Sequence, residues 1–255
     1  MTVQPNPDQT QPRILRTFTT LHQLRSTWGG SLTLSLGLDP VGAALSIAAN
    51  IAGAVSLAID DNPTHLREVV RIGACDFVVN TLDEAIRAMK NEVRKHAPLS
   101  VALQANPFLA IKEILDRGLS PQLFSTFLSP SGRNPQQTST FIHAVDRFQS
   151  QGASLVDFST GESTSQPTPF TPSGTLLTPL LTERDWTLYT FPFDTPAALR
   201  TFDSLALSVL SPQDTLRRRW LEAAPRILQR QRPPQRALWL TPPEAEALLS
   251  QHNLS

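Results

Sequence analysis

The residues best placed to do chemistry lie in one stretch that runs from Gly37 to Asp60. Gly37 and Gly42 frame a short turn after one apolar run, and Asp60 ends the next apolar run. In a dinucleotide-binding fold, a glycine turn lets the backbone approach a pyrophosphate, and an acid about 20 residues later accepts the ribose hydroxyls. The spacing therefore predicts cofactor contacts from Gly37, Gly42 and Asp60, with NAD as the possible cofactor.

The same turn has a second interpretation that needs no cofactor. Asp39 places a negative charge where phosphate would sit, and Pro40 removes one backbone N–H donor. Asp-Pro is also a strong signal for the start of a helix, because Asp caps the helix and Pro suits its first turn. The local chemistry alone favours this helix start over a phosphate site.

Other reactive side chains are scattered along the chain. None of the five histidines has a second ligand at metal-binding spacing, so no metal site is predicted. Cys75 precedes a predicted strand, as a small buried residue often does, and no serine stands in a Gly-x-Ser-x-Gly turn. We therefore assign no catalytic residue. The histidines are His22, His65, His96, His143 and His252.

Two further patterns concern surfaces. The basic run Arg217–Arg219, with more arginines up to Arg236, predicts a solvated helix face or an oligomer contact, with phosphate or an acidic partner as the alternative. Aromatic residues alternate between Trp186 and Phe193, a pattern typical of packing on a core or of a dimer interface.

Alternating strands and helices are expected to position these residues. The predicted strands are 32–36, 55–59, 76–80, 99–104, 122–126 and 154–158. The predicted helices, one before the first strand and the others between strands, are 15–26, 43–51, 64–71, 82–95, 108–117 and 140–151. This alternation predicts an α/β fold with a Rossmann-like, mostly parallel sheet flanked by helices. Later elements are expected at 186–193 (strand or extended), 196–210 and 212–231 (helices), 236–240 (strand) and 242–250 (helix).

The composition divides the chain into four segments. Residues 1–12 are polar and rich in proline and predict a disordered tail, and residues 13–158 form the Rossmann-like core. Residues 159–178 are rich in Ser, Thr, Pro and Gly and predict a flexible loop. Residues 179–255 are expected to pack on this core as a small C-terminal helical extension.

The bulk properties exclude several classes of partner. The chain has 22 basic and 22 acidic residues, which argues against nucleic acid or a membrane surface held by electrostatics. One cysteine allows no internal disulfide, so a cytoplasmic location is expected. The N-terminus lacks the pattern of a signal peptide, and the longest apolar stretch, 41–57, is too short to span a bilayer.

Several segments together resemble one known family. Trp28-Gly29-Gly30-Ser31-Leu32, the turn Gly37–Gly42 and the stretch from Ile51 to Asp60 resemble the central domain of urocanase (urocanate hydratase), as do 76–87, 100–103 and 114–121. Residues 146–158 and 219–239 resemble later parts of the family more patchily. The resemblance implies a Rossmann-like fold, a homodimer, and a lyase of histidine degradation that uses tightly bound NAD as an electrophile.

The resemblance also implies where this chain departs from the family. The glycine-rich phosphate turn is replaced by Gly37–Gly42, a histidine-bearing loop by Phe127–Gly132, and an asparagine-rich turn by Phe158–Glu162. Leu238 stands before Trp239 where the family has a cysteine. The N-terminal domain that helps form the family's active site is expected to be missing.

Three hypotheses follow from these features. The first is a shortened, degenerate urocanase relative without hydratase activity, acting as a homo-oligomeric, dimeric binding or regulatory protein with a small-molecule ligand. The second is an active urocanase-like, NAD-dependent hydro-lyase or another NAD-using enzyme, because the strand–turn–helix–strand–Asp60 frame is intact. The third is a module that docks on a separate chain that supplies the missing domain.

Overall fold

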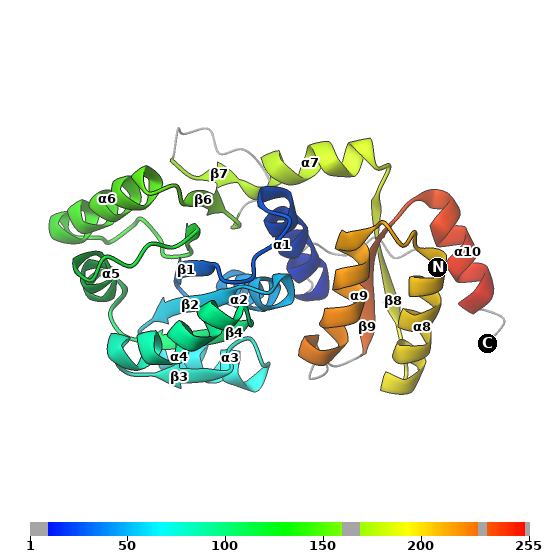
Figure 1. Cartoon of the computed structure of the whole chain (residues 1–255), viewed down its shortest axis with the longest axis horizontal. Helices are drawn as coiled ribbons and strands as arrows, with labels where there is room; N and C mark the ends of the chain where they lie inside the picture. The colour runs from blue at the N-terminus through cyan, green and yellow to red at the C-terminus, as the bar shows by residue number, and fades with distance from the viewer. Residues whose placement is uncertain (1–9, 160–168, 229–233, 253–255) are drawn as a thin grey trace.

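The computed structural model describes residues 10–159, 169–228 and 234–252, which form a parallel seven-stranded sheet and an antiparallel pair (Figure 1). The strands of the large sheet are β1 (Leu32–Leu36), β2 (Val55–Asp60), β3 (Phe77–Val79), β4 (Leu99–Gln104), β5 (Leu123–Thr126), β6 (Ser154–Asp157) and β7 (Thr171–Pro172). They are arranged in the order β3-β4-β2-β1-β5-β6-β7, and all their pairings are parallel.

Helices cover both faces of this sheet. One face carries α1 (Thr10–Leu24), α2 (Pro40–Ala52) and α3 (Pro63–Arg71), and the other carries α4 (Leu82–Lys95), α5 (Pro107–Asp116) and α6 (Pro135–Ser150). Successive residues of β2 alternate between the two apolar cores, with Leu57 on the α4–α6 side and Ala58 on the α1–α3 side. All six residues of β2 are buried, which explains why four of them are apolar. The predicted Rossmann-like α/β fold is confirmed.

Small side chains let α2 lie close to the sheet. The helix contains five alanines and one glycine, and most of its residues are buried. The hydroxyl of Ser100 in β4 donates to the carbonyl oxygen of Ser46 in α2 over 3.2 Å. This contact holds the middle of α2 against β4, and the short turn after β1 places the N-terminus of α2 at the carboxyl end of β1.

The helix starts follow the capping signals in the sequence. Asp39, Asn62, Thr81 and Asn106 accept backbone N–H bonds at the starts of α2, α3, α4 and α5. The predicted start of the next helix at residue 140 is wrong, because α6 begins at Pro135. The capping box of Asn134 and Gln137 extends it by more than one turn into the expected loop.

The C-terminal part contains strands as well as helices. Its elements are α7 (Ser173–Glu183), β8 (Thr187–Pro192), α8 (Pro196–Val209), α9 (Thr215–Leu228), β9 (Gln235–Leu240) and α10 (Pro242–His252). β8 and β9 form the antiparallel pair, where the sequence predicted a strand or extended segment at 186–193 and a strand at 236–240. The alternating aromatic residues pack inside this part, with Phe191 and Phe193 against Phe202 of α8.

Two segment boundaries differ from the prediction. The first helix begins at Thr10 rather than after a tail of 12 residues, because Gln11 is buried and its side chain accepts from the backbone N–H of Ala237 at 2.7 Å. The expected loop 159–178 contains β7 and the start of α7, with Leu177 buried. Residues 1–9 and 160–168 of the two predicted segments lie outside the described part of the chain.

Of the helices that the structure describes, none is long and apolar enough to cross a membrane.

Candidate functional site

The sheet reverses its strand order beside β1. β1 pairs with β2 on one side and with β5 on the other, although β5 follows β4 in the chain. In open α/β sheets, ligands bind at the carboxyl ends of the strands where the order reverses. The turn after β1, the end of β2 and the loop after β5 therefore define the candidate site.

The turn after β1 ends in a helix start that caps itself. Oδ1 of Asp39 accepts the backbone N–H of Val41 at 3.0 Å and that of Gly42 at 2.9 Å. Pro40 occupies the first turn of α2 and has no N–H to offer. A carboxylate of the chain itself thus takes the place at this helix N-terminus where a bound phosphate would accept hydrogen bonds.

Asp60, at the end of β2, makes three internal contacts. Its Oδ2 accepts the backbone N–H of Leu38 at 2.6 Å and lies 2.9 Å from Nδ1 of His65, and its Oδ1 accepts the N–H of Asn62 at 2.7 Å. Asp60 is only 4% exposed. The carboxylate therefore ties the turn after β1 to the start of α3, and both of its oxygens are engaged.

The two glycines of the turn lie against the loop after β5. Gly37 has φ +96°, a backbone conformation that favours glycine. Its N–H donates to the carbonyl oxygen of Ile59. A Cβ on Gly42 would overlap the carbonyl oxygen of Gly37 and would lie 2.9 Å from Cδ2 of Phe127. The glycines thus serve close packing of the turn on Phe127.

The structure brings Gly37, Gly42 and Asp60 together at the carboxyl ends of β1 and β2, as the sequence pattern placed them. Their role in cofactor binding stays a prediction. Among the other positions singled out, Leu238 is fully buried in β9, and Thr160, Gly161 and Glu162 lie outside the described residues.

The remaining reactive residues do not assemble into a second centre. In the described part of the chain, no group of three or more His, Cys, Asp or Glu side chains could hold a metal ion. Cys75 is buried, as its position before a strand predicted, and burial raises the pKa of its thiol to about 12. At neutral pH the thiol is therefore protonated and a poor nucleophile.

The basic run forms the predicted solvated helix face only in part, because Arg217 is buried whereas Arg219 is exposed. Arg217 is buried, forms ion pairs with Asp214 and Glu244, and lies over the ring of Trp186 at 4.7 Å. Arg219 donates from Nε to the carbonyl oxygen of Ile51 at 2.9 Å. Arg217 joins α9 to α10, because its buried guanidinium satisfies several acceptors at once, and Arg219 joins α9 to the end of α2. Arg230 and Arg232 lie outside the described residues.

A cavity beside the turn escaped the sequence analysis. It encloses about 900 Å³ between α2 and α3, next to the ends of α1 and α9. Pro40, Ala43, Ala44 and Ile47 line it from one face of α2. The sequence does indicate this cavity in one respect. Small residues recur at helical spacing on the side of α2 that faces the polar, basic side of α3, and small side chains leave space between the two helices.

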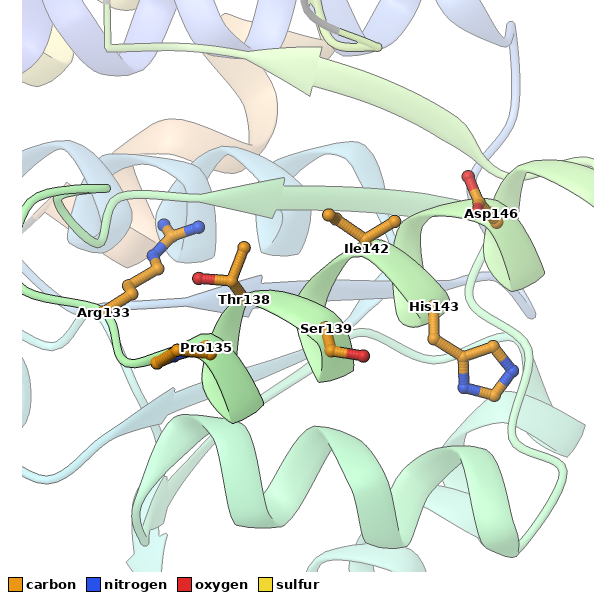
Figure 2. A pocket seen from close by; sticks show the side chains of 7 residues that line it. All are labelled: Arg133, Pro135, Thr138, Ser139, Ile142, His143 and Asp146. Carbon is orange, nitrogen blue, oxygen red and sulfur yellow. The ribbon is translucent and has the colours of Figure 1, made fainter.

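A second hollow lies over α6 and is open to solvent (Figure 2). Arg133, Thr138 and Ile142 lie along one side of the helix in Figure 2, and Ser139 and His143 lie along the other. Arg133 donates from Nη2 to the carbonyl oxygen of Leu128 and stacks on Phe141 at 4.4 Å. Because these polar groups do not converge on one point, the hollow offers no preorganised site for a small ligand.

The parallel order, the glycine turn and the acid at the end of β2 define the class of protein: a Rossmann-like α/β protein. Comparison with protein families makes this more specific, since residues 14–130 match the family model described as "Urocanase Rossmann-like domain". The chain therefore carries a urocanase-like Rossmann domain, and the resemblance seen in the sequence is confirmed for this segment. The resemblance of 146–158 and 219–239 lies outside the match and stays a prediction.

Proposed function

We propose that this protein is a urocanase-like Rossmann-domain protein that lacks hydratase activity and acts by binding. The observation that carries the proposal is the helix start after β1, where Asp39 occupies the position at which the family fold would hold the cofactor phosphates. The parallel sheet of the Rossmann-like fold is intact. At the carboxyl ends of its strands, however, Asp60 already contacts Leu38 and His65.

The residues at this edge do not fit a dinucleotide. At a separation of about 4 Å, repulsion between the Asp39 carboxylate and one phosphate charge would cost about 4 kcal/mol at an effective dielectric constant near 20. The attraction of a helix N-terminus for an anion is worth only about 0.3–1 kcal/mol, so repulsion outweighs it. Asp60 in turn would have to give up its contacts with Leu38, Asn62 and His65 to accept ribose hydroxyls.

The position that the resemblance aligns with a family cysteine supports the same proposal. Leu238 is fully buried in β9, and no side chain there can act as a nucleophile or an acid. The neighbouring indole of Trp239 donates to the hydroxyl of Thr19 in α1 over 2.9 Å. These two residues therefore pack the C-terminal elements against α1.

The proposal is tested by native mass spectrometry of the purified protein together with an assay of urocanate consumption. We expect the mass of the chain without a dinucleotide, and no consumption of urocanate with or without added NAD. A dinucleotide that copurifies with the protein, together with robust urocanate turnover, would support the second hypothesis, a urocanase-like NAD-dependent lyase.

We also propose that the protein acts in the cytoplasm as a homodimer that associates through α5 and α6. The single cysteine supports the location, and two large apolar side chains on these neighbouring helices, Leu109 and Ile142, are 72% and 53% exposed. Light scattering after size exclusion should report a dimer that Leu109→Lys with Ile142→Lys converts to a monomer. Phe77→Lys, at an exposed apolar site on β3, is the control and should stay dimeric. A monomeric wild-type protein would favour docking on a separate chain.

A further inference from the structure

The cavity between α2 and α3 has the composition of a ligand site. Most of its lining is apolar and comes from α2, α3, the turn after β1 and α9. These residues are Leu38, Pro40, Ala43, Ala44, Ile47, Val69, Ile72 and Leu228. Its volume of about 900 Å³ lies within the range of about 300–1,000 Å³ that is typical of small-molecule sites.

The polar part of the lining is basic. Arg13, Arg67 and Arg71 contribute three guanidinium groups, against one carboxylate from Glu68. Glu68 is already paired with Arg71, through contacts of 2.7 and 2.6 Å. Among the residues that the structure describes, Arg67 makes only a long contact of 3.5 Å with Thr64, which leaves its charge to meet an anion.

His65 adds a group that is held in a fixed orientation. Its Nδ1 lies 2.9 Å from the buried carboxylate of Asp60, which leaves Nε2 as the ring nitrogen that can meet a ligand. A carboxylate behind an imidazole fixes its tautomer and orientation. Asp60 therefore positions a cavity side chain, a role that differs from binding a ribose.

We propose that this cavity binds a small amphipathic anion, with an apolar, aromatic-sized body between α2 and α3 and one carboxylate or phosphate group at Arg67, while Nε2 of His65 offers a separate polar contact. The proposal rests on the proposed role as a binding protein and names the class of its ligand. The site lies beside the turn after β1 and does not use the capped N-terminus of α2, so the charge of Asp39 does not exclude it.

The test uses 8-anilinonaphthalene-1-sulfonate, which joins an aromatic body to one anionic group and fluoresces in apolar sites. We expect one molecule bound per chain, and weaker binding of the neutral N-phenyl-1-naphthylamine. Arg67→Glu should weaken binding of the sulfonate about five- to tenfold, because it replaces attraction by repulsion at an exposed position. Arg94→Glu, an equal charge change on an exposed residue of α4, should leave the affinity unchanged.

Two further measurements test where the ligand binds and which anionic group the cavity prefers. Ala44→Leu narrows the apolar part of the cavity beside α2 and should weaken binding, and competition by 1-naphthoate and 1-naphthyl phosphate should identify the preferred anionic group. No saturable binding, or equal binding by wild type, Arg67→Glu and Ala44→Leu, would overturn the proposal. The proposed function as a binding protein without hydratase activity would still hold in that case, provided that the protein carries no dinucleotide and consumes no urocanate. Turnover of urocanate would instead overturn this proposed function.

Discussion

At the scale of single residues, a side chain of the protein itself performs a task that a bound phosphate performs at many helix N-termini. Asp39 satisfies two N–H groups at the start of α2, and a phosphate at this place would satisfy the same donors. The capped start is stable without any cofactor. Because a cap and a phosphate compete for the same donors, two substitutions of Asp39 together separate the loss of the cap from the loss of the negative charge.

Asp39→Ala should lower the free energy of unfolding by about 1 kcal/mol, since it removes the cap of α2. Asp39→Ser should retain most of the stability, because Ser also caps helices while it removes the negative charge. Urea denaturation followed by circular dichroism measures both variants. An unchanged stability of Asp39→Ala would mean that the two hydrogen bonds do not hold the helix start.

At the scale of the elements, local signals in the sequence predicted most of the sheet and its helices. The strands 32–36 and 99–104 and the helix 82–95 have the same bounds in the structure. Strong caps and regular apolar periodicity fix such elements locally. The start of α6 was missed because Asn134 and Gln137 form a capping box inside a segment whose composition is that of a loop.

The candidate site was only partly predictable. The sequence placed Gly37, Gly42 and Asp60 together, since these positions depend on strand ends alone. It did not show that Asp60 contacts His65 or that Phe127 lies on Gly42, because both contacts depend on how separate elements pack. The burial of Arg217 was missed for the same reason, since its partner Glu244 comes from a distant helix.

Gly42→Ala tests how tightly the turn, α2 and the loop after β5 pack. The new Cβ would overlap the carbonyl oxygen of Gly37. We therefore expect the free energy of unfolding to fall by about 1–3 kcal/mol. Phe127→Ala combined with Gly42→Ala should not restore the stability, because the closest contact is with backbone. Thermal denaturation of the single and double variants decides this, and full rescue by Phe127→Ala would place the constraint in the aromatic ring instead.

At the scale of the whole molecule, the C-terminal elements share one apolar core with α1 and α2. A buried ion pair holds these elements together, with Arg236 of β9 donating to both carboxylate oxygens of Asp203 in α8 at 2.7 and 2.8 Å. Figure 1 shows α1 between the large sheet and the β8–β9 pair. The stability of the protein therefore depends on contacts far from the candidate site.

Asp203→Ala should lower the free energy of unfolding by about 3–5 kcal/mol, because it leaves the guanidinium of the fully buried Arg236 without its counter-ion. Asp203→Leu combined with Arg236→Met should recover most of this loss, since an apolar pair avoids the cost of burying charge. Chemical denaturation of the single and double variants provides the measurement. A small effect of Asp203→Ala would show that water or another acceptor replaces the carboxylate.

The pH dependence of stability should report on the junction between α1 and α9. Burial lowers the pKa of His22 in α1 from its ordinary value of 6.5; Arg219 also lowers this pKa, whereas Asp214 raises it. As the pH falls below about 6.5, the unfolded chain takes up a proton at this position more readily than the folded one, so the native state loses stability.

His22→Gln should remove this contribution, because glutamine stays neutral at every pH. We expect the loss of unfolding free energy between pH 7.5 and pH 5.5, measured by urea denaturation, to be smaller in His22→Gln than in the wild type. His143→Gln, at an exposed position on α6, is the matched control and should retain the wild-type loss. An identical loss in His22→Gln and the wild type would mean that protonation of His22 between α1 and α9 does not lower the free energy of unfolding.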